Sequence, residues 1–294
     1  MTAAVSILPA QQLAALNEAY GRAVARRRLR FTIGAAVFFA ALVVAAFGAE
    51  VNLWTLFTYF GHFVSYFDRI LTLDDGRRVW TDIPEWLWGW KKWSLLLGET
   101  LLISYVGTLA GAVLGFALNF LAAANTSPAP WLRFIIKRLL EFCRTVPGIV
   151  FALIFVIAFG LGPMAGVLAI AIHSVGALAK QFAEIVENID MKSVEGVRST
   201  GASWLSCMRF AVVPQVAAGF ASYTLLRFEI NVREASVMGF IGAGGIGVEL
   251  ITAIRKFYYS DVSAILLMII VTVFVIDIST GWIRGRLFGR ERRT

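Results

Sequence analysis

The feature that most constrains this chain is a series of long stretches without a formal charge. Residues 31–49, 100–132 and 145–179 contain no Asp, Glu, Lys or Arg. A helix rises 1.5 Å per residue, so about 20 apolar residues cross the roughly 30 Å of bilayer hydrocarbon. The chain is 59% hydrophobic and only 16% charged, whereas a soluble domain carries about a quarter charged residues. These stretches therefore predict an integral membrane protein and exclude a disordered chain or a disulfide-rich secreted domain.

Breaks inside the stretches set the boundaries of the predicted spans. Asn125, Pro128 and Pro130 end the second stretch near residue 124, because proline cannot continue a helix comfortably. Residues 160–163 (GLGP) divide the third stretch into a tight hairpin of two short spans. We therefore predict an all-α membrane protein with about six transmembrane helices, at about 31–49, 100–124, 145–160, 164–179, 210–226 and 262–283.

The distribution of basic residues predicts the orientation. With six spans and a cytoplasmic N-terminus, 18 of the 27 basic residues fall inside: Arg22, Arg26, Arg27, Arg28, Arg30, Arg133, Lys137, Arg138, Arg144, Lys180, Lys192, Arg198, Arg209, Arg284, Arg286, Arg290, Arg292 and Arg293. Lys and Arg are retained on the cytoplasmic side of membranes. Residues 1–30 and the tail 284–294 are thus predicted to be cytoplasmic, in the inner membrane of a bacterium. The net charge of +8 then reflects topology rather than affinity for nucleic acid.

The aromatic-rich segment 50–93 is predicted to lie outside. Residues 54–93 hold 12 aromatic side chains, including six of the nine Trp. Such rings prefer the headgroup level, and a seventh span here would invert every basic segment that follows. The first apolar stretch follows a thirty-residue segment that contains five arginines, and it lacks a small-residue cleavage site, so we expect it to stay as an anchor rather than act as a signal peptide.

A glycine-rich segment, residues 242–247 (GAGGIG), fits the dinucleotide pattern GxGxxG. Its context excludes that role, because no strand–turn–helix unit fits between membrane spans. Two structural alternatives remain for residues 239–250: an unwound pore or gate segment, or close packing of small residues. Cys143 and Cys207 fit small buried side chains, and no metal-ligating cluster is evident.

The hydrophilic interruption 180–209 carries the most informative motif. Glu195 is followed by Gly201 six residues later and by Pro214 thirteen residues beyond that. This spacing resembles the EAA signature of permease subunits of ABC importers. Gly196 and Val197 stand where that pattern has two alanines, and Ala211 and Val213 replace its Ile and Leu, so small and apolar character is preserved.

Further segments narrow the resemblance. Residues 194–202 (VEGVRSTGA), 213–215 (VPQ), 223–233 (YTLLRFEINVR) and 242–248 (GAGGIGV) look like the phosphonate-type permeases, over about residues 94–283. These permeases are the membrane subunits of importers for phosphonate, phosphite and related oxyanions. The resemblance implies a type I ABC importer permease fold, alternating access, an external substrate-binding protein and a second permease copy, identical or related.

The resemblance also implies an ATPase partner. The chain has no GxxxxGK[ST] loop, so ATP and Mg²⁺ would be bound by a cytoplasmic ABC ATPase dimer, and this chain has no catalytic residue or cofactor of its own. In such permeases the EAA segment forms a short coupling helix seated in the ATPase. The residues carried over to this role are Glu195, Gly196, Arg198, Gly201, Ala202, Trp204 and Pro214.

The charged residues after the fifth predicted span have two interpretations. Arg227, Glu229, Arg233 and Glu234 form internal ion pairs, or an arginine joins free amides near Gly242, Gly244, Gly245 and Gly247 in a weak positive path for an oxyanion. His173 is read as a hydrogen-bonded packing residue, and Glu99 and Asp277 as contacts to headgroups or helix termini.

The residues also bear on three alternative functions. The substrate alternative is another small solute carried by the same kind of ABC permease. An ion-coupled secondary transporter requires acidic residues near mid-span and two repeat halves, and neither is evident from the sequence. A membrane enzyme would need a nucleophile or metal motif, and the chain has only His62 and His173 and no HExxH, GxSxG or SxxK arrangement. The sequence leaves open which phosphorus oxyanion is carried and whether the permease pairs with itself or a paralogue.

Overall fold

The computed structural model describes residues 10–291, apart from the side chains of residues 10–15, 53, 56 and 288–291. Residues 1–9 of the predicted N-terminal segment and 292–294 of the predicted basic tail lie outside the described residues. Two compact units divide the chain, the first ending at Ser65 and the second beginning at Tyr66. The second unit contains residues 145–179, which were predicted to form a hairpin. It also contains the predicted coupling loop 180–209, called the coupling segment below, and the charged group Arg227, Glu229, Arg233 and Glu234.

The described chain is helical. Its α-helices are α1 (Ala10–Gly48), α2 (Leu53–Ile70), α3 (Ile83–Trp86), α4 (Trp90–Ala122), α5 (Pro130–Thr145), α6 (Gly148–Phe159), α7 (Pro163–Glu187), α8 (Met191–Ser199), α9 (Trp204–Cys207), α10 (Val213–Met238), α11 (Ile246–Arg255) and α12 (Tyr259–Glu291). Short 3₁₀ turns lie at Val79–Thr81 and Gly239–Ile241, and a π-turn at Met208–Val212. From residue 10 to residue 291 the only strand-like pairing is one isolated bridge between Thr72 and Arg78.

Within residues 10–291, five helical segments are long and apolar enough to cross a membrane, or six if one bent pair counts as a span. The five are Leu16–Gly48, Trp90–Ala122, Pro163–Glu187, Trp204–Ile241 and Tyr259–Leu287, and the bent pair is α5 with α6. This agrees with the predicted all-α membrane fold of about six spans. The apolar part of α1 is exposed along its length, as expected for a helix that faces lipid.

The region predicted as a hairpin of two short spans takes a different form. The helix within 145–160 is α6, which has 12 residues and rises only about 18 Å. It joins α5 at a bend of 85°, so the two helices form one broken unit. Pro147 explains the break, because proline disfavours helical backbone in the residue before it and supplies no amide. The turn into α7 has positive φ at Gly160 and Gly162, as the GLGP segment requires.

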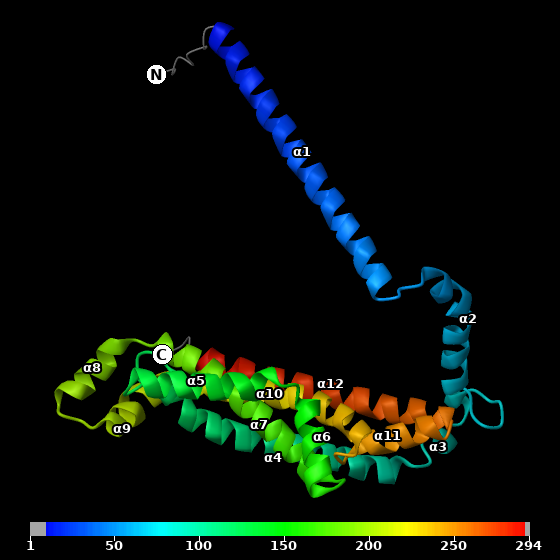
Figure 1. Cartoon of the computed structure of the whole chain (residues 1–294). Helices are drawn as coiled ribbons and strands as arrows, with labels where there is room; N and C mark the ends of the chain where they lie inside the picture. The colour runs from blue at the N-terminus through cyan, green and yellow to red at the C-terminus, as the bar shows by residue number, and fades with distance from the viewer. Residues whose placement is uncertain (1–9, 292–294) are drawn as a thin grey trace, which may run out of the picture. The chain divides into compact units, whose positions relative to one another are not determined.

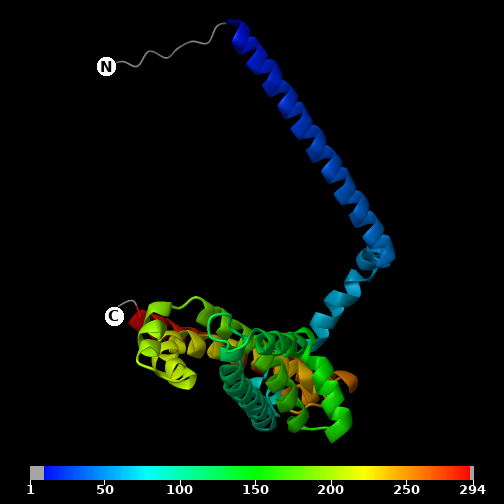
Figure 2. The ribbon, with the colours of Figure 1, turned by 60° about the vertical axis from the view of Figure 1, so that its left-hand side comes forward.

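The second unit is a bundle built around α4 and α7. Figure 1 and Figure 2 show α4, α7, α10 and α12 running alongside one another, with α8 and α9 at one end and α3 and α11 at the other. Gly107, Gly111 and Gly115 recur every fourth residue on α4, and their α-carbons lie against Ile170, Ser174 and Ala179 of α7. Small residues at this spacing let membrane helices approach closely.

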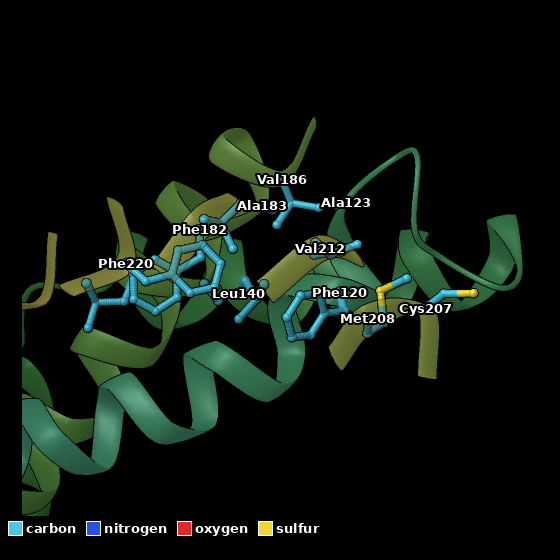
Figure 3. Close-up of a cluster of buried hydrophobic side chains, with 14 of the residues drawn as sticks. Phe120, Ala123, Leu140, Phe182, Ala183, Val186, Cys207, Met208, Val212 and Phe220 are labelled. Atoms are coloured by element: carbon cyan, nitrogen blue, oxygen red, sulfur yellow. The ribbon is translucent and has the colours of Figure 1, made fainter. Parts of the chain in front are cut away.

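Apolar clusters hold each end of this bundle. The cluster at the α8–α9 end is drawn in Figure 3, where Phe182 of α7 stacks on Phe220 of α10 with ring centroids 4.1 Å apart. Cys207 and Met208 from the coupling segment pack into the same cluster. The coupling segment is therefore anchored to the bundle by its own core.

Candidate coupling segment and translocation path

Helix α8 presents three of the seven predicted coupling residues on an exposed face. The Asp190 carboxylate caps the helix by accepting the amide of Lys192 at 3.0 Å. Val194 turns inward and is buried, whereas Glu195, Gly196 and Arg198 are exposed. The helix is thus amphipathic, and its outer face carries one carboxylate, one guanidinium and a gap without a side chain.

The two glycines of this segment, Gly196 and Gly201, differ in backbone conformation. Gly201 has φ +79°, a left-handed conformation that other residues adopt only with strain. Gly196 is helical, and a Cβ placed there would meet no atom within 4 Å. The chain itself explains Gly201 but not Gly196.

Trp204 is held by its own chain. Its indole N–H donates to the carbonyl of Thr126 at 2.7 Å, which ties α9 to the loop between α4 and α5. In the same loop Asn125 donates to the carbonyl of Val186 at 2.7 Å. Trp204 is 39% exposed in this chain, and its hydrogen bond to Thr126 holds α9 beside that loop.

Pro214 lies behind the coupling helix at the start of α10. The amide of Val213 bonds to the carbonyl of Met208, five residues earlier, and closes the π-turn Met208–Val212. Pro214 then follows in the first turn of α10, where its missing amide leaves no intrahelical bond unmade. Pro214 therefore lies in the first turn of α10. Ala202 is half-buried and lies between α8 and α9.

Helix α10 continues through the charged residues that the sequence placed after the fifth span. Glu229 is 5% exposed, pairs with Arg233 of the same helix, and has its second oxygen 3.6 Å from Nη2 of Arg284 on α12. Arg227 Nη2 lies 3.6 Å from Glu234. Each member of the group therefore has an opposite charge beside it, which is the internal ion-pair interpretation.

Glu229 and Glu234 lie within α10, inside the candidate span Trp204–Ile241, and beyond residue 226, where the predicted fifth span ended. The pairing of both carboxylates with arginines explains how a helix crossing apolar surroundings tolerates them.

A buried polar layer beside Arg227 was missed by the sequence analysis. Asn231 is fully buried and donates to Thr108 Oγ1 at 2.7 Å and to Ser174 Oγ at 2.9 Å, and Arg227 Nε donates to Ser174 Oγ at 3.3 Å. Ser104 adds a bond to the Asn231 carbonyl at 3.2 Å. Thr100, Ser104 and Thr108 recur every fourth residue of α4, and that periodicity was the available signal.

The glycine segment is unwound and also closely packed, and its role as a pore or gate stays a prediction. Gly242, Gly244 and Gly245 have φ of +85°, +86° and +74°, so the backbone is unwound between α10 and α11. A Cβ on Gly247 would overlap the Ser236 carbonyl oxygen at 2.1 Å and would lie 2.9 Å from Cα of Gly239. The glycines are needed both for the turn and for the close approach.

The expectation of free amides in this segment was wrong for most of it. The amides of Gly242 and Ala243 donate to Gly239 and Met238. Those of Gly245 and Ile246 donate to the side chains of Glu99 at 3.3 Å and Thr100 at 2.9 Å. The start of α11 is therefore capped by α4, and Glu99 contacts a helix terminus as predicted.

His173 lies half-buried on α7 within electrostatic range of Arg227 and Glu234, and its ring faces the Val146 carbonyl. Its Nδ1 is buried without a hydrogen-bond partner in the described chain, so that atom does not fit a fully bonded packing residue. Across the described residues no group of three or more His, Cys, Asp or Glu side chains is placed to hold a metal ion.

Comparison with known proteins assigns the family. Residues 107–293 match the binding-protein-dependent transport system inner membrane component. The chain belongs to this family. It is 41% identical over 196 residues to the phosphite transport system permease protein PtxC of Stutzerimonas stutzeri, covering 67% of this chain and 71% of that protein. It is 39% identical over 198 residues to the phosphate-import permease protein PhnE of Mycolicibacterium smegmatis, but spans only 37% of that protein.

Solved transporters share the fold. A bacterial ABC transporter that imports the acidic polysaccharide alginate superposes with a TM-score of 0.59 at 11% identity, covering 83% of this chain and 96% of that one. The inward-facing MetNI methionine ABC transporter gives a TM-score of 0.57 at 18% identity, over 66% and 95% of the two chains. The chain is thus a membrane protein with the fold of ABC importer permeases.

Proposed function

We propose that this chain is the permease subunit of an ATP-driven importer that carries a phosphonate, phosphite or related phosphorus oxyanion into the cytoplasm. The observation that carries the proposal is the 41% identity to a phosphite permease across 71% of its length. Weaker likeness extends to a di/tripeptide permease of Pseudomonas aeruginosa at 29% identity, which fits a common scaffold with different solutes.

Helix α8 is proposed to couple ATP hydrolysis to transport. Its exposed face offers Glu195 and Arg198 as polar contacts around the open position at Gly196, which suits close approach of a partner's backbone. Trp204 and the core residues Cys207 and Met208 hold this surface on the bundle, so a push on α8 reaches α4, α7 and α10. Dimerisation of two ATPases around ATP and Mg²⁺ would move two such permeases as rigid bodies between inward-facing and outward-facing states.

The remaining partners and the orientation follow from the same assignment. Two permease copies, identical or related, enclose the path, and an external binding protein delivers the solute. The α8–α9 end and both chain termini face the cytoplasm, in agreement with the bias of basic residues. The unwound backbone at Gly242, Gly244, Gly245 and Gly247 is proposed to line the path at the level where α10 ends.

The test of coupling uses two changes on the exposed face. Glu195→Lys reverses a charge, and Gly201→Asp adds a charge at a left-handed position. Both are expected to abolish uptake and ATPase co-purification while leaving the permease in the membrane. Glu141→Lys on α5 reverses a charge in a surface pair with Arg138 and serves as the control. Wild-type uptake and co-purification in both coupling variants would defeat the assignment.

A further inference from the structure

We propose that a groove between α4 and the coupling segment binds an anionic phospholipid of the cytoplasmic leaflet, with one acyl chain in the groove and the phosphate headgroup at Arg209. The binding follows from the surface of this chain and does not depend on which solute is carried. The choice of leaflet and the consequence for coupling rest on the proposed function, in which the α8–α9 end faces the cytoplasm.

The groove lies where the C-terminal end of α4 meets α9 and the π-turn, and it has a volume of about 460 Å³. Its apolar walls come from α4 and from the coupling segment and include Phe116, Ala117, Phe120, Trp204, Leu205 and Met208. In the described chain Arg209 is the one charged residue that lines it. Because such walls offer few hydrogen bonds and lose contact with water when covered, the groove suits a hydrocarbon chain.

The groove continues an exposed apolar face of α4. Leu102, Tyr105, Leu109 and Val113 recur every three or four residues, which places them on one side of the helix, and they are 49% to 64% exposed. This face leads toward Phe116 and lies within the candidate span Trp90–Ala122. An acyl chain that lies along α4 therefore reaches the groove without leaving the hydrocarbon of the bilayer.

Arg209 supplies the charge for the headgroup. It lies four residues before the start of α10, and its side chain is exposed. Its guanidinium is 5.3 Å from the ring centroid of Phe210, and no carboxylate of the described chain pairs with it. A guanidinium presents a planar fork of donors that suits a phosphate, and a basic residue near the membrane surface attracts anionic lipids. An unpaired positive charge beside an apolar groove is complementary to a molecule with a negative head and an apolar tail.

The neighbours of Arg209 fit the level of lipid headgroups. Leu205 and Phe210 are 69% and 64% exposed, although both lie at the edge of the hydrophilic interruption between spans. Trp204 donates its indole N–H to Thr126, and its ring lines the groove. Tryptophan prefers the boundary between hydrocarbon and water. This places α9 against the membrane surface and leaves the exposed face of α8 for the ATPase.

A lipid in this groove supports the coupling segment from outside. Met208 lines the groove and is also buried beside Phe120 in the apolar cluster of Figure 3. An acyl chain in the groove packs on the outer side of that contact. Lipid binding thereby stabilises the seat of the coupling segment on the bundle, which the proposed coupling requires.

The test is photo-crosslinking of the full-length permease in lipid nanodiscs. Phosphatidylglycerol with a photoreactive group on one acyl chain is mixed into phosphatidylcholine, and cross-linked peptides are identified by mass spectrometry. We expect saturable cross-links to the peptides that carry Phe116 and Leu205, and weaker ones from photoreactive phosphatidylcholine. Arg209→Gln should reduce cross-linking by phosphatidylglycerol about fivefold, the factor that one basic residue near an anionic surface contributes. Arg138→Gln on the exposed face of α5 is the matched control.

A second pair of variants tests the groove itself. Ala117→Trp fills it and should abolish cross-links at Leu205 from either lipid, whereas Val113→Trp adds the same ring one turn earlier on α4, outside the groove, and should leave them unchanged. The proposal is overturned if Ala117→Trp has no effect or if both lipids cross-link the wild type equally. Coverage of the groove by α1 or by a second permease, seen as an absence of lipid cross-links at Leu205, overturns it as well.

Uptake is measured separately, in proteoliposomes with and without phosphatidylglycerol. We expect uptake of the phosphorus oxyanion to be faster when phosphatidylglycerol is present. Equal uptake in both membranes would overturn the supporting role of the lipid. An absence of uptake for every phosphorus oxyanion in both membranes would defeat the proposed function, and the cross-links would still report on the lipid site.

Discussion

At the scale of single residues, Gly196 and Gly201 show that the same residue type occurs in two different local environments. Gly201 is required by its own backbone, which has φ +79° in open surroundings. Gly196 is required by nothing in this chain and sits in the middle of α8. The sequence motif treats both as one signature, whereas the structure shows that only Gly201 has a backbone conformation that favours glycine.

This separation gives a prediction for two matched substitutions. Gly201→Ala should destabilise the coupling segment by about 1–2 kcal/mol, because alanine is strained in the left-handed region. Gly196→Ala should leave the isolated permease unchanged or stabilise α8 by about 0.5–1 kcal/mol, yet weaken binding of the ATPase. Thermal unfolding in nanodiscs and ATPase co-purification measure the two effects. Equal loss of stability in both variants would contradict the distinction.

At the scale of elements, the sequence predicted what depends on local pattern. The long uncharged stretches marked α1, α4, α7 and α12 as spans, and the motif spacing located the coupling segment. It did not predict that α5 and α6 form a bent unit, because a 12-residue apolar helix reads like part of a span. Nor did it predict the cap on α11, since Gly245 and Glu99 lie 146 residues apart in the chain.

The seating of α11 provides a prediction at this scale. Gly247→Ala would place a methyl group on the Ser236 carbonyl and against Gly239, so α11 must move away from the end of α10. Overpacking of this kind costs about 1–3 kcal/mol. Gly98→Ala on α4 meets no atom within 4 Å and is the matched control. The midpoint of thermal unfolding should therefore fall for Gly247→Ala but not for Gly98→Ala. An unchanged midpoint in Gly247→Ala would show that α11 is not tightly seated.

At the scale of the whole molecule, the sequence indicated the membrane, the family and the partners. The arrangement of the candidate translocation site escaped it. Arg227 of α10 and Ser174 of α7 lie far apart in the chain, and their hydrogen bond depends on how α10 packs against α7. Charge alone could not choose between Arg227 and Arg233, which lie on one helix and differ in what packs against them.

Orientation is tested by labelling single cysteines in a variant with Cys143 and Cys207 replaced by alanine. Asp74→Cys lies on the exposed hairpin after α2, and Ser193→Cys lies on the exposed face of α8. A membrane-impermeant maleimide applied outside intact cells should label the first position, and the second only after permeabilisation. The reverse pattern would place α8 outside and remove any contact with a cytoplasmic ATPase.

The central claim is that ATP hydrolysis by a partner drives a phosphorus oxyanion through this chain. The most direct measurement is uptake of radiolabelled phosphite and methylphosphonate into proteoliposomes that contain the permease and its ATPase, with the binding protein outside and ATP inside. We predict accumulation that stops when the Walker lysine of the ATPase is mutated and that is insensitive to dissipation of ion gradients. Accumulation that persists with the mutated ATPase, or that collapses with the ion gradients, would contradict the account.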